Sequence, residues 1–69
     1  MIDYQPFWAT LKASQESTYT LINTHHIPSS TIDRLRKNKS VTTATIDNLC
    51  RILGCNLDGV MRYSPCDDD

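Results

Sequence analysis

A chain of 69 residues, with seven Lys and Arg against eight Asp and Glu and a formal net charge of −1, has room for one domain. A domain of this size buries only about 60% of its unfolded surface, and dinucleotide-binding or barrel folds need far more chain, so we do not expect an enzyme. Hydrophobic residues make up 39% of the chain, which is polar for a globular domain but more apolar than a disordered segment.

Neither a membrane span nor an export signal is visible in the sequence. No stretch approaches the roughly 20 apolar residues that cross a bilayer, and the N-terminal residues lack the basic and apolar regions of a signal peptide. The three cysteines are odd in number and unevenly spaced, so they do not suggest a disulfide framework. We therefore expect a cytoplasmic protein without a membrane partner.

The charges are concentrated in two places. Three Asp residues occupy positions 67–69, and removing them would raise the formal charge from −1 to +2. We expect residues 64–69 to form a mobile acidic tail. Four cations lie within six residues: Arg34, Arg36, Lys37 and Lys39. This cluster fits either a solvated helix end or a nucleic-acid contact.

The first part of the chain predicts three helices. An aromatic and aliphatic stripe at helical spacing predicts a helix over about 5–13, with Pro6 in its first turn. Ser17 is a candidate N-cap for a short helix over 18–24 that carries Leu21 and Ile22. Ser29 and Ser30 then open a helix over 29–37, with Ile32 and Leu35 facing inward.

The second part predicts two more helices. The segment Thr42 to Gly54 has apolar residues on one helical face, a threonine to cap its start and a glycine for a left-handed C-cap. Asn56 can cap a last short helix, after which Tyr63 would close the core. We thus predict an all-α fold of five compact helices without a sheet, with these residues buried together: Leu21, Ile32, Leu35, Ile46, Leu49, Leu53 and Val60.

The pair of helices over 18–24 and 29–37 carries the functional signal. Its second helix has hydroxyls at its N-terminal end and cations at its C-terminal end and in the following loop. A helix-turn-helix presents its second helix to the major groove in this way, while flanking cations neutralise phosphates.

We expect residues 1–63 to form one helix-turn-helix DNA-binding domain, and from about Tyr4 to Tyr63 the chain resembles a known family. The chain resembles the Cro and lambda-repressor-like (XRE) helix-turn-helix regulators, in particular their minimal single-domain members. The strongest pieces of the resemblance are 17–23, 30–36 and 42–55. It implies a lambda-repressor-like fold and a sequence-specific DNA-binding transcriptional regulator, with repression the favoured action. It also implies a double-stranded DNA operator and a homodimer, for which Met61, Tyr63 or Trp8 are candidate interface residues.

The resemblance also implies a set of DNA contacts. Thr18 would contact the backbone or a base, Ser29 and Ser30 would read the major groove, and further contacts would come from Asp33, Arg34, Lys37, Asn38 and Lys39. The sequence departs from the family where His26 replaces the usual turn glycine and Pro28 the usual cap. Histidine tolerates a left-handed backbone, though less readily than glycine.

Other functions are weighed against this one. The ligand types of a zinc site occur at Cys50, Cys55, His25 and His26, but without a C-x-x-C pair, so we expect neither a metal nor a cofactor. The two histidines fit plain surface groups better than a pH switch. No small-molecule substrate is indicated. The first alternative function is a protein-interaction module, antitoxin-like or accessory, that uses the same helical surface. The second is a structural homo-oligomer without a nucleic-acid role.

Overall fold

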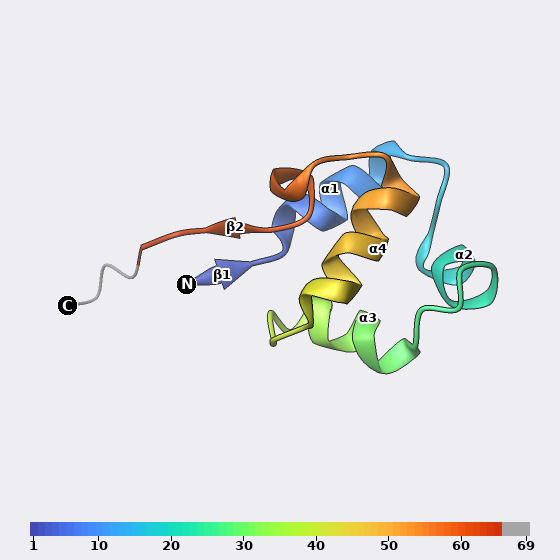
Figure 1. Cartoon of the computed structure of the whole chain (residues 1–69), viewed down its shortest axis with the longest axis horizontal. Helices are drawn as coiled ribbons and strands as arrows, with labels where there is room; N and C mark the ends of the chain where they lie inside the picture. The colour runs from blue at the N-terminus through green and yellow to red at the C-terminus, as the bar shows by residue number, and fades with distance from the viewer. Residues whose placement is uncertain (66–69) are drawn as a thin grey trace.

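A computed structural model of the chain describes residues 1–65. Within them are four α-helices and a two-stranded antiparallel sheet, which extends from one side of the helices and pairs residues near the beginning of the chain with residues near its end (Figure 1). The elements in order are β1 (Ile2–Asp3), α1 (Gln5–Ala13), α2 (Thr18–Asn23), α3 (Ser29–Arg36), α4 (Thr43–Leu53), the 3-10 turn η1 (Leu57–Gly59) and β2 (Arg62–Tyr63).

The helix boundaries follow from local caps. The Ser17 hydroxyl accepts a hydrogen bond from the Thr20 backbone N–H at the start of α2, and Thr42 caps α4 in the same way. Gly54 ends α4 at φ 65°, a left-handed conformation that glycine adopts without strain. The four predicted helices over 5–53 are thereby confirmed.

The prediction of five helices and no sheet is wrong in the last segment. Only the single turn η1 follows α4, and the chain then becomes extended. The Val60 carbonyl, which a continuing helix would use, instead accepts a hydrogen bond from the Phe7 N–H at 3.1 Å. Arg62 and Tyr63 then pair with Asp3 and Ile2. Tertiary contact with the start of α1 therefore decides the conformation of this segment.

A polar cluster fastens the ribbon formed by β1 and β2. Arg62 Nε lies 3.2 Å from Asp3 Oδ2, and Arg62 Nη2 donates to Gln5 Oε1 at 2.6 Å. The pKa of the Asp3 carboxyl lies below its ordinary value because it accepts a hydrogen bond from the Gln5 backbone N–H and faces the Arg62 guanidinium. The Ser64 N–H donates to the Met1 carbonyl at 2.9 Å, which extends this pairing by one residue.

One hydrophobic core joins all four helices. Ten hydrophobic residues are buried: Tyr4, Phe7, Leu11, Leu21, Ile27, Ile32, Leu35, Ile46, Leu49 and Val60. Six of the seven predicted core residues are among them. Leu53 is only half-buried, and Tyr63, expected to close the core, is 68% exposed because it lies on the ribbon.

The described residues contain no helix that is long and apolar enough to span a membrane. Of the predicted acidic tail, Cys66 and residues 67–69 lie outside the described part of the chain.

Candidate nucleic-acid interface

The turn between α2 and α3 sets the geometry of the candidate site. His26 adopts φ 60°, so it takes the left-handed conformation expected where glycine is usual. The Ile27 N–H donates to the Leu21 carbonyl at 2.9 Å, and the Ile27 side chain is buried. Pro28 then starts α3 from extended backbone. The turn is therefore anchored by one buried side chain and one backbone bond.

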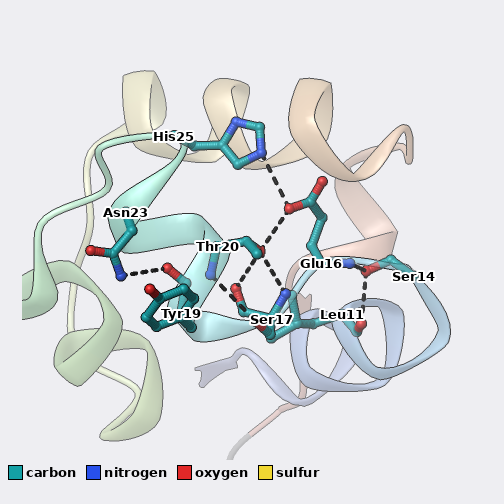
Figure 2. A network of polar contacts seen from close by, with 8 residues as sticks. All are labelled: Leu11, Ser14, Glu16, Ser17, Tyr19, Thr20, Asn23 and His25. Carbon is teal, nitrogen blue, oxygen red and sulfur yellow. Dashed lines mark hydrogen bonds and ion pairs between the residues drawn. The ribbon is translucent and has the colours of Figure 1, made fainter.

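A polar network holds α2 (Figure 2). At its start, the Thr20 hydroxyl accepts from the Ser17 N–H at 2.8 Å and donates to Glu16 Oε1 at 2.8 Å. The same carboxylate oxygen lies 3.2 Å from Nε2 of His25, which follows the helix. Both ends of this six-residue helix are thereby tied to one carboxylate, and His25 has a structural partner rather than a plain surface position.

The exposed face of α3 carries the residues predicted to read DNA. Thr31, Ile32 and Leu35 are buried and fix the rotation of the helix. All five candidates on α3 and at its C-cap are exposed, namely Ser29, Ser30, Asp33, Arg34 and Lys37. Among residues 1–65, no side chain caps the start of α3. Its first turn therefore presents hydroxyls and N–H groups outward.

The cations at the end of α3 differ in their partners. Lys37 Nζ lies 3.2 Å from Asp33 Oδ2, one turn earlier, and both side chains are more than half exposed. Arg36 lies over the Trp8 ring, with Cζ 5.6 Å from the ring centroid, so it packs toward α1. In the described residues Arg34 forms no ion pair, and it remains exposed on the face of α3.

The loop after α3 is fastened to the start of α1. Asn38 is left-handed at φ 57°, and the Lys39 N–H donates to the Arg34 carbonyl at 2.8 Å, which closes the helix end. Asn38 Oδ1 accepts from the Tyr4 N–H at 3.1 Å, while the Tyr4 hydroxyl donates to the Lys39 carbonyl at 2.9 Å. Within residues 1–65, neither the Asn38 amide NH₂ nor the Lys39 ammonium takes part in these bonds, so both remain for a ligand.

Seven of the eight predicted contact residues are thus gathered along α3 and its following loop, and each of the seven is exposed. Thr18 is half-buried at the start of α2, on a separate element. Sequence reasoning missed the part that Tyr4 plays in holding the loop. Because Tyr4 lies 34 and 35 residues from its partners, no local pattern could have revealed it.

The other histidines, cysteines and acidic residues in the described part of the chain form no metal site. In residues 1–65, no group of three or more His, Cys, Asp or Glu side chains lies close enough together to hold a metal ion. Cys50 and Cys55 are half-buried free thiols. Burial raises the pKa of the Cys55 thiol, and the neighbouring Cys50 adds to this rise.

Comparison with known proteins identifies the domain type. The family model described as the Cro/C1-type HTH DNA-binding domain matches residues 7–65, from the first turn of α1 to the residues after β2. No curated protein and no solved structure matches the chain.

Proposed function

The chain belongs to the Cro/C1-type helix-turn-helix family, a family of DNA-binding domains and not of enzymes, and we propose that it is a sequence-specific transcriptional regulator that acts as a repressor. In this proposal α3 enters the major groove of a double-stranded operator and blocks other proteins there. The proposed site of action is the cytoplasm.

The exposed face of α3 is the observation that carries the proposal. Ser29 and Ser30 stand at the helix start, where a recognition helix meets base edges, and Arg34 follows one turn later. Lys37 and Lys39 are exposed at the C-terminal end of α3 and in its loop, where they would neutralise phosphates of the DNA backbone. The Asn38 amide and Thr18 on α2 complete the proposed set of backbone contacts.

An apolar surface supports the proposed homodimer. Ile2, Leu57, Met61 and Tyr63 line a hollow of about 470 Å³ beside the ribbon, and Leu57 and Tyr63 are 58% and 68% exposed. One recognition helix buries little surface on DNA, and a two-fold dimer doubles the contacts on a symmetric operator. This surface favours Met61 and Tyr63 as dimer residues over Trp8, whose ring is already covered by Arg36.

The same apolar surface also fits the second candidate, a module that binds another protein. Instead of the helical surface expected from the sequence, that function would use the hollow and leave the cations of α3 in solvent. The two functions therefore differ in whether α3 binds DNA or the ribbon surface binds another protein.

Selection of the purified protein against random duplexes tests the proposal. We expect one enriched, two-fold-symmetric sequence, bound by a dimer in sedimentation experiments. Replacing Lys37 or Lys39 with Ala should weaken binding to every duplex equally and lower the salt slope by about one unit each. Arg51→Ala is the matched control, because this exposed cation lies on α4.

Two results would contradict these proposals. Equal retention of all duplexes, unchanged when Lys37 and Lys39 are both replaced, would reject the DNA-binding function in favour of the protein-interaction module. A monomer that protects a single half-site would reject the dimer alone.

A further inference from the structure

A carboxylate lies in the middle of the face that is proposed to read DNA. Ser29, Asp33 and Lys37 are spaced four residues apart, so they form one row along the exposed side of α3. Asp33 is the acidic member of this row and faces solvent. The inference that follows rests on the proposed function, since it concerns the operator that α3 would bind.

An acidic side chain at this place is costly unless it finds a hydrogen-bond donor. Phosphates surround a helix that lies in the major groove, and they repel a carboxylate. Lys37 lies 3.2 Å from Asp33, but the two side chains are 58% and 52% exposed, so their attraction in water is weak. When Lys37 turns to a phosphate, Asp33 loses this partner.

Few base edges in the major groove offer a hydrogen-bond donor that could replace Lys37 as the partner of Asp33. In the major groove, guanine presents two acceptors and thymine an acceptor and a methyl group, and neither can donate to a carboxylate. Adenine presents its amino donor beside the N7 acceptor, which repels the second carboxylate oxygen. The amino group of cytosine is the donor that a carboxylate fits best.

We propose that Asp33 is a specificity-determining residue that accepts a hydrogen bond from the N4 amino group of cytosine. The operator half-site then carries a C·G pair beneath the middle of α3. The carboxylate contributes less to affinity than to discrimination, because it is repelled by phosphates on every sequence and is compensated only where cytosine is present.

The chain contains a matched control for this role. Asp47 and Arg51 on α4 form an ion pair with the same four-residue spacing, at 3.0 Å and with both side chains exposed. Asp47 borders the apolar hollow formed with Tyr4, Ile46 and Met61 rather than the face of α3. Neutralising Asp47 therefore removes an equivalent charge and an equivalent helix pair without touching the proposed base contact.

The experiment measures binding of the full chain to the selected operator and to each of its single-base variants. The wild-type protein should prefer cytosine at one position by about tenfold or more. Asp33→Ala should lose that preference and bind bulk DNA more tightly. Asp33→Asn should shift the preference to adenine, because asparagine pairs with the N6 and N7 atoms of that base. Asp47→Asn should keep the wild-type preference.

The outcomes distinguish a failure of the proposed cytosine contact from a failure of the proposed DNA-binding function. A wild-type protein that selects no operator rejects the DNA-binding function, and the role of Asp33 falls with it. A selected operator whose base preferences all survive Asp33→Ala, with affinity raised equally on every duplex, overturns the role of Asp33 alone. Circular dichroism of each variant verifies that these exposed substitutions leave the helices intact.

Discussion

The two helices of the helix-turn-helix begin in opposite ways. At the start of α2, the Ser17 and Thr20 side chains satisfy each other's backbone N–H groups, and Glu16 joins them to His25 beyond the helix end (Figure 2). At the start of α3, Pro28 offers no cap, and within residues 1–65 no other side chain supplies one.

This difference suits the two helices to different tasks, because α2 stabilises the fold and α3 is proposed to bind DNA. Groups that are already bonded within the protein rigidify α2, whereas groups without internal partners at the start of α3 remain for a ligand. Substitutions at the two starts should therefore change different quantities, namely the free energy of unfolding for α2 and the affinity for DNA for α3.

The largest effect should come from the packing that both helices share. Leu21 on α2 is fully buried in the common core with Leu35 on α3. Leu21→Ala should lower the free energy of unfolding by about 2–5 kcal/mol, because it removes buried methyl groups and leaves a cavity. Thermal or urea unfolding monitored by circular dichroism measures this loss. A loss below that range would show that the helix pair does not depend on a tightly packed contact.

The next largest effect should be on DNA binding and should come from a residue of α3. We propose that the Arg34 guanidinium pairs with the O6 and N7 atoms of one guanine, so Arg34→Ala should cost about 1–3 kcal/mol of binding free energy at that base position. The melting temperature should stay unchanged, since the side chain is exposed. Anisotropy titrations with operator variants measure the effect, with Arg51→Ala as the control. A uniform loss on all sequences would assign Arg34 to the phosphate backbone.

A matched pair of serines compares the two starts directly. Ser17→Ala should destabilise the fold by about 1 kcal/mol, because a capping bond is lost, and should leave the salt dependence of DNA binding as it was. Ser30→Ala should leave stability unchanged and weaken operator binding by about 1 kcal/mol, the net value of one hydroxyl bond. If the two substitutions changed the free energy of unfolding equally, the proposal that α2 serves stability and α3 serves DNA binding would be wrong.

The smallest expected effect lies in the turn that joins them. His26 holds φ 60°, which strains a residue with a Cβ by roughly 1–2 kcal/mol, and glycine avoids this strain at an entropic cost of about 0.4–1 kcal/mol. His26→Gly should therefore raise the free energy of unfolding by about 0.5–1 kcal/mol. Destabilisation by this substitution would mean that the imidazole makes a contribution of its own.

Local signals were sufficient to predict the four helices over residues 5–53, but they also predicted a fifth helix where only the turn η1 forms. Thr42 and Gly54 bracket α4 as the sequence suggested, and His26 adopts the backbone that its position requires. The ribbon was not predictable, because strands of two residues show no alternation. Its formation depends on Val60 and Tyr63 meeting residues at the other end of the chain.

The candidate site was also predictable only where local sequence signals decide the structure. Exposure and charge along α3 could be predicted from the positions of Ile32 and Leu35, which must face inward. The ion pair of Lys37 with Asp33 follows from their four-residue spacing, but the position of Arg36 over Trp8 of α1 could not be predicted. Such contacts depend on which helix packs next to which, and sequence periodicity does not contain that information.

The ribbon also brings two residues that are 63 positions apart in the sequence into direct contact. Met1 and Ser64 are joined by backbone hydrogen bonds in both directions, so a short peptide could link residue 64 to residue 1 without moving either strand. A covalent ring of about 60 residues would remove roughly 4 kcal/mol of chain entropy from the unfolded state. Backbone cyclisation is therefore a route to a more stable form of the domain that leaves every side chain of α3 unchanged.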